Sequence, residues 1–160
     1  MSWLFRRGGT KPREAAARLD AFLARRGLDR SRLTPRRALD AMIELYRTER
    51  FDRCDLANDG DMLLFQWGAY EWEGPDRFSL DVTRQLMWSD PEGDDQVWQL
   101  SIRFGFPLTD AMRAAGSSNR WCRAPSELDG FRAFVESTPA YAAVADDARS
   151  APEIRFESAE

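Results

Sequence analysis

The chain has 160 residues, of which 43% are apolar and 31% charged, with a formal net charge of -4 and no histidine. A chain of this length is typical of one compact domain that folds without disulfides or a structural metal. The missing histidine excludes Ser-His and Cys-His nucleophiles and imidazole-bound zinc. The sequence also has no nucleophile-elbow, phosphate-loop or dinucleotide-binding motif, so we expect a non-enzymatic protein without a cofactor.

The cellular compartment is predicted from absent signals. The first residues, Met1–Arg7, hold a run of only three apolar side chains before an arginine pair, which is too short for a signal peptide. No apolar run approaches the roughly 20 residues that cross a bilayer. Cys54 and Cys122 form no CxxC motif. We therefore expect a cytoplasmic protein with reduced thiols and no membrane partner, and the use of arginine for all but one basic residue indicates a GC-rich bacterial genome.

Charge divides the chain into two unequal parts. Residues 1–50 hold 13 basic and 6 acidic groups, a net of +7, whereas residues 51–160 have a net of -11. We expect residues 1–12 to form a flexible arm, 13–150 a single domain, and 151–160 a tail or an edge strand.

Two helices are predicted near the N-terminus. Residues 13–26 carry Leu19, Phe22 and Leu23 at helical spacing and end before Gly27. A second helix begins at Thr34-Pro35, a capping residue followed by proline, and continues to about residue 50. The short connection predicts an antiparallel helix pair.

From residue 51 onward, alternation with a period of two predicts strands. The Asp59-Gly60 pair between 51–57 and 62–72 is typical of a hairpin. In 77–88 and 98–106 the even positions are apolar, apart from Arg84, and the odd positions are mostly polar. The pattern predicts a four-stranded antiparallel meander with the even positions buried and the odd positions wet.

After Pro107 the helical pattern returns in three short segments, near 109–115, 126–135 and 138–144. We expect Ser117–Asn119 to form a polar loop between the first two of them. Helices before and after a run of strands predict an α+β fold, with the C-terminal helices packed on one face of the sheet.

Arg84 is the residue most out of place, because its position in the alternation is an inward one. A buried guanidinium without a partner is very costly. A bulge could reverse its direction, it could lie at a sheet margin and extend to solvent, or it could pair with an acid and line a pocket.

The odd positions of the sheet form a second candidate site. Cross-strand neighbours lie about 5 Å apart, which allows Asp81 and Arg103 to pair. The set is either an ordinary solvated face or a flat recognition surface; its members are Asp81, Thr83, Gln85, Ser101, Arg103 and the neighbouring Gln66.

Aromatic side chains supply a third candidate site. Trp67 shares the inward positions of its strand, so we assign it to the core. Tyr70, Trp72 and Trp121 are better candidates for partly exposed anchors, because aromatic residues contribute much of the binding energy at interfaces.

Two other kinds of site are disfavoured. The acidic turn at 55–61 resembles a calcium loop, but Ala57 and Gln66 fall where oxygen ligands are required, so no metal is expected. The arginines of residues 1–50 form a basic cluster, yet the connection between the helices is too long for a helix-turn-helix and the protein is acidic, which disfavours nucleic acid.

The sequence therefore predicts a binding protein. Being small, acidic and without catalytic motifs, it resembles in general style the bacterial immunity proteins, which implies a protein partner that is basic and is neutralised by binding. The acidic loop that contains Asp94 and Asp95 would attract such a partner. The alternative is a small-ligand pocket near Arg84 and Trp121, and homo-oligomerisation stays open.

Overall fold

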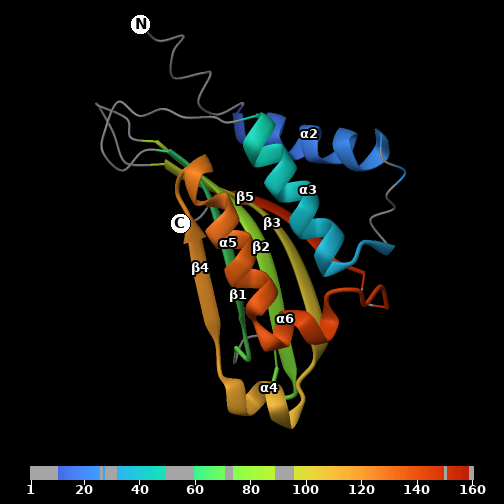
Figure 1. Ribbon diagram of the computed structural model, residues 1–160. Coiled ribbons are helices and arrows are strands. Elements are labelled where there is room, and N and C mark those ends of the chain that lie inside the picture. The colour runs from blue at the N-terminus through green and yellow to red at the C-terminus, as the bar shows by residue number, and fades with distance from the viewer. Residues whose placement is uncertain are drawn as a thin grey trace, which may run out of the picture.

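The computed structural model describes residues 11–25, 27, 32–49, 60–70, 74–88, 96–149 and 151–158. Within them lies a five-stranded antiparallel sheet in the order β4-β1-β2-β3-β5 (Figure 1). Its strands are β1 (Gly60–Gly68), β2 (Arg77–Trp88), β3 (Gln96–Pro107), β4 (Ser118–Cys122) and β5 (Glu153–Ser158). The α+β class is confirmed.

The two N-terminal helices form as expected, with slightly different bounds: α2 spans Lys11–Arg25 and α3 spans Pro35–Thr48. Thr34 caps α3, because its Oγ1 accepts a hydrogen bond from the backbone N–H of Arg37 at 3.2 Å. Gly27 has a φ of 64°, the left-handed conformation that favours glycine after a helix. The two helices pack against each other, and their axes cross at an angle (Figure 1).

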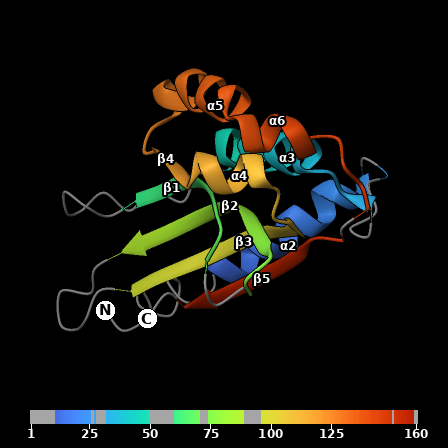
Figure 2. The same ribbon diagram turned by 90° about the horizontal axis from the view of Figure 1, so that it is seen from below.

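Helices α3, α5 (Leu128–Ser137) and α6 (Pro139–Val144) lie over one face of the sheet, while α2 contacts β3 and β5 (Figure 2). The short helix α4 (Asp110–Ala115) lies in the crossover from β3 to β4 and is capped by Thr109. The helix expected from residue 126 begins at Leu128, because Pro125–Glu127 form a 3-10 turn before it. None of the described helices is long and apolar enough to cross a membrane.

The predicted alternation of β2 and β3 is confirmed. Their apolar even positions whose side chains are described are at most 3% exposed and face the helices: Phe78, Leu80, Val82, Leu86, Leu100, Ile102, Phe104 and Phe106. A one-residue slip of either strand would move this whole set to the other face, which fixes the register. The side chains of Trp88 and Trp98 lie outside the described part.

The predicted four-stranded meander is only partly correct. Strands β1, β2 and β3 follow one another as expected, but the predicted first strand, 51–57, lies outside the described residues. The described neighbour of β1 on that side is β4, which pairs with it from Leu63↔Cys122 to Trp67↔Ser118. The predicted polar loop at 117–119 is therefore wrong from Ser118 onward, and the C-terminal segment is the edge strand β5 rather than a tail.

Candidate functional site

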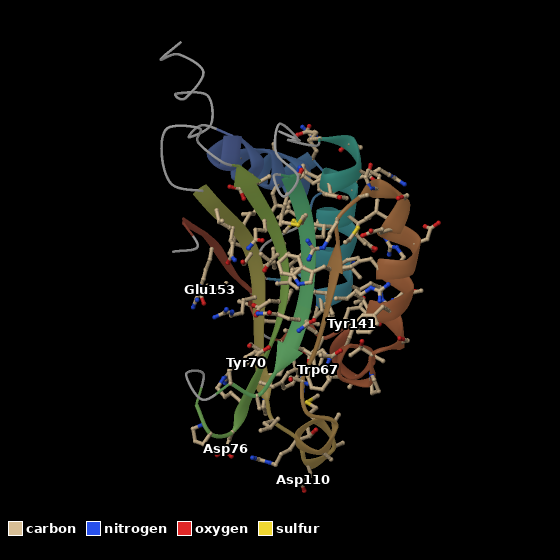
Figure 3. All side chains as sticks on the ribbon, turned by 90° about the vertical axis from the view of Figure 1, so that its left-hand side faces the viewer. Trp67, Tyr70, Asp76, Asp110, Tyr141 and Glu153 are labelled. Atoms are coloured by element: carbon tan, nitrogen blue, oxygen red, sulfur yellow. The ribbon has the colours of Figure 1, made fainter. Side chains whose placement is uncertain are left out.

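The sheet face turned away from α3, α5 and α6 is called the outer face below. Figure 3 shows Tyr70 and Glu153 on this side and Trp67 and Tyr141 on the side of the helices. The strand registers place the following described side chains on the outer face: Met62, Leu64, Gln66, Arg77, Ser79, Asp81, Thr83, Gln85, Val97, Gln99, Ser101, Arg103, Asn119, Trp121, Glu153 and Arg155.

A row of polar side chains crosses the outer face through four strands. Arg103 Nε donates to Asp81 Oδ1 at 2.7 Å, which confirms the predicted Asp81–Arg103 pair. Gln66 Nε2 donates to the other oxygen, Asp81 Oδ2, at 3.4 Å. Glu153 stands opposite Arg103 on β5. The carboxylate of Asp81 is thus fixed from both sides, and it holds the guanidinium of Arg103 in one place.

The expectation of a wet outer face is wrong in the centre of the sheet. Asp81 is only 1% exposed, and Ser79, Thr83 and Ser101 are also buried. These side chains are short, and they belong to β2 and β3, which have a neighbouring strand on both sides. Thr83 Oγ1 and Ser101 Oγ satisfy each other at 3.0 Å.

Tyr70 lies beside this polar row. A Cβ placed on Gly68 would be 3.0 Å from Tyr70 Cζ and 3.2 Å from its hydroxyl, so the absence of a side chain at Gly68 makes room for the ring. Burial raises the pKa of the Tyr70 hydroxyl; the charge of Asp81 also raises it, and that of Arg103 lowers it. Tyr70 is thus half-buried next to the ion pair.

The outer face ends in charged or aromatic side chains at both edges. On β5, Arg155 Nε contacts Glu153 Oε1 at 2.7 Å, and this hydrogen bond holds the pKa of Glu153 below its usual value. On β4, Trp121 is half-buried opposite Leu64, and the guanidinium of Arg123 lies 5.6 Å from its ring centroid.

Arg84 points inward as its position in β2 predicts. The β1–β2 register runs without interruption from Gly60↔Met87 to Gly68↔Ser79, which rules out a bulge. The side chain is fully buried, which rules out a sheet margin. Arg84 Nε donates to Asp61 Oδ1 at 2.8 Å, and Nη2 donates to Asp61 Oδ2 and to the carbonyl of Glu49. Of the three explanations, pairing with an acid is the correct one.

Arg84 and Trp121 are not brought together. Arg84 stands opposite Leu63 and faces the helices, whereas Trp121 stands opposite Leu64 and belongs to the outer face. A single pocket on one side of the sheet cannot use both side chains.

Of the other predicted site residues, only Gln85 lies in the described part of the chain. Gln85 is half-buried on the outer face, beside Gln99 of β3 and Met62 of β1. Trp72, Asp94 and Asp95 lie outside the described residues. The described residues also hold no cluster of three or more acidic or cysteine side chains that could bind a metal, and Cys122 is buried with Sγ 3.3 Å from the carbonyl of Ala124.

Sequence reasoning missed Asp61 and the role of the edges. Asp61 belongs to the acidic turn in the sequence, but it also shares the inward positions of Leu63 and Phe65, and its charge is opposite to that of Arg84. Glu153 and Arg155 alternate with apolar residues, which indicated an edge strand but gave no cross-strand partner.

Comparisons with protein-family models, with curated proteins and with solved structures find no match to the chain. The function must therefore be argued from the geometry of the outer face.

Proposed function

We propose that the chain is a non-enzymatic binding module that holds a partner protein on the outer face of its sheet. The observation that carries the proposal is the polar row through Gln66, Asp81 and Arg103, fixed by hydrogen bonds on a sheet face that no described helix covers. A solvated sheet face needs no such order.

The fixed geometry favours binding for an energetic reason. Association costs conformational freedom, and side chains that are already held in place lose less of it. Asp81 holds Arg103 before any partner arrives. Tyr70 and Trp121, both half-buried, flank the polar row and are of the type that contributes most at interfaces. A polar centre with aromatic residues on both sides is therefore suited to contact the surface of another protein.

The partner class that we propose is a basic protein, neutralised in the manner of the immunity proteins. It is supported by the net charge of -11 in residues 51–160, since a strong field of one sign accelerates encounter with a partner of the opposite sign. The small-ligand alternative is less well supported, because Arg84 and Trp121 face opposite sides of the sheet.

A pair of matched variants tests the outer face. Gln85→Arg and Gln99→Arg each place a long charged side chain on this face without touching the polar row, and Ala133→Arg places the same side chain on an exposed site of α5. Partner proteins are captured from cells of the source organism, identified, and their affinities measured by calorimetry. We expect the two outer-face variants to lose the partner and Ala133→Arg to keep it; equal affinities would contradict the proposed face.

A second experiment tests the partner's charge. Replacing Asp94 and Asp95 by lysine is expected to slow association with a basic partner and to weaken its salt dependence. If low salt retains no protein partner while a small molecule raises the melting temperature, the small-ligand alternative replaces the proposal.

A further inference from the structure

The strand β4 forms one edge of the sheet. In the sheet order its only described neighbour is β1, and Figure 1 shows no described strand along its other side, while α5 packs against β4 from the side of the helices. Alternate backbone N–H and C=O groups of an edge strand point away from the sheet, where they can pair with a strand from another chain. An extended peptide can add to such an edge.

Two arginines lie at this edge, Arg120 in β4 and Arg123 directly after it. Arg120 and Arg123 are both exposed, and each guanidinium carbon lies 5.6 Å from the centroid of an aromatic ring, Phe134 and Trp121 respectively. Within the described residues neither guanidinium has a carboxylate at ion-pair distance; the carboxylate of Glu127 accepts from the backbone N–H of Arg123, at 2.7 Å.

Several other surface arginines are paired with carboxylates. Arg36, Arg132 and Arg149 each contact an aspartate, at 2.9, 2.6 and 2.6 Å. At the opposite sheet edge, Arg155 is paired with Glu153. The guanidiniums beside β4 are therefore held in position by rings and keep their charge available for an incoming carboxylate.

The two arginines reach both sides of the edge. Arg120 lies on the side of the helices, against Phe134 of α5, whereas Arg123 contacts Trp121 and Met62 on the outer face. Side chains of an added strand alternate between the same two sides. Acidic residues on either side of that strand would therefore meet a guanidinium.

We propose that β4 binds an extended acidic segment of a partner protein, which joins the sheet as an additional edge strand. Backbone hydrogen bonds to β4 hold the segment, and Arg120 and Arg123 select its charge. Positive charge at a short edge strand repels basic segments and attracts acidic ones, so the same residues that protect the edge make it selective. This site is separate from the polar row at the centre of the outer face.

The direct test uses a fluorescein-labelled peptide of alternating glutamate and valine, with its binding followed by anisotropy. We expect Arg120→Glu and Arg123→Glu together to weaken binding by at least tenfold, and Arg113→Glu, a matched reversal at an exposed site on α4, to leave it unchanged. A peptide with lysine in place of glutamate should not bind. Equal binding by the charge-reversed and native proteins overturns the proposal.

A second pair of peptides tests the backbone contact. N-methyl groups are placed on alternate residues, in the odd positions of one peptide and the even positions of the other. Strand addition predicts that one peptide binds and the other does not, because only one set of N–H groups faces β4. If both bind equally, or if Gln85→Arg on the outer face abolishes binding, the peptide does not lie along this edge and the proposal is wrong.

Discussion

The guanidinium of Arg84 and the carboxylate of Asp61 form an ion pair inside the core, with both side chains completely buried. The pair is diagonal across β1 and β2, since Arg84 stands opposite Leu63 and Asp61 opposite Leu86. Arg84 also donates to the carbonyl of Glu49, the residue that follows α3. The pair therefore joins the start of β1, the later part of β2 and the end of α3.

Removing one member of this pair should be strongly destabilising. Arg84→Met leaves the carboxylate of Asp61 buried without its guanidinium partner. Asp61→Leu leaves the guanidinium of Arg84 buried without its carboxylate partner. Each is expected to lower the free energy of unfolding by about 3–5 kcal/mol. Urea titration of the purified variants measures the loss.

The double variant Arg84→Met/Asp61→Leu serves as the control. It replaces both charges by apolar groups, so its cost should be far below the sum of the two single costs. Additive costs would show that the two side chains do not depend on each other.

Apolar side chains in the centre of the sheet should stabilise the fold because they fill the core beneath the helices. Leu80→Ala and Ile102→Ala each leave a cavity beneath the helices, because both side chains are fully buried. The expected cost is about 2–5 kcal/mol in the free energy of unfolding. Gln99→Ala, half-buried on the outer face, should change it by less than about 0.5 kcal/mol. A similar loss for Gln99→Ala would contradict the assignment of faces.

The alternation of β2 and β3 could be predicted because each residue's face depends only on its position in the strand. The Asp81–Arg103 pair followed from the same logic, once the two strands were placed side by side. Trp67 was likewise assigned to the core correctly, and it is 2% exposed.

The position of β4 could not be predicted in this way. Its sequence, Ser118–Cys122, is short and mostly polar, and it joins the sheet only because a crossover through α4 carries it to the far side of β1. The partner of Arg84 depends on the same kind of long-range placement. Burial on the outer face was missed because it arises from neighbouring side chains and not from hydrophobicity.

Two glycines on the outer face should respond differently to an added methyl group. A Cβ on Gly68 would lie 2.9 Å from Ser117 Cβ and 3.0 Å from Tyr70 Cζ, whereas one on Gly105 would lie 2.7 Å from Arg77 Nη2. The guanidinium of the exposed Arg77 can move away, but the ring of Tyr70 is half-buried. Gly68→Ala should therefore cost about 1–3 kcal/mol of unfolding free energy.

Gly105→Ala is the matched comparison for this prediction. Alanine is favoured over glycine inside a strand by roughly 0.5–1 kcal/mol, so this variant should be neutral or slightly stabilised. Thermal unfolding of both variants measures the difference. If Gly105→Ala is as destabilised as Gly68→Ala, the guanidinium of Arg77 is held more firmly than its exposure indicates.

The hydroxyl of Tyr141 should make stability depend on pH at the alkaline end. Burial raises its pKa to about 12, with opposing contributions from nearby charges on α3 and α5. The ring of Tyr141 packs edge-on against Phe65, with 6.1 Å between the two ring centroids. The unfolded chain loses this proton near pH 10 and the folded protein near pH 12, so the unfolded state binds fewer protons in between. The contribution is therefore fully present below about pH 10 and is lost as the pH rises towards 12.

Tyr141→Phe separates this effect from general alkaline denaturation. Among the described residues no group forms a hydrogen bond with the buried Tyr141 hydroxyl, so its removal should leave stability at neutral pH unchanged or slightly higher. Between about pH 10 and 12 the native protein should lose stability more steeply than the variant, because the variant cannot release the proton. Urea titrations at stepped pH measure both slopes. Parallel slopes would show that the hydroxyl titrates as it does in the unfolded chain, and that it is not shielded by the packing of α6 on the sheet.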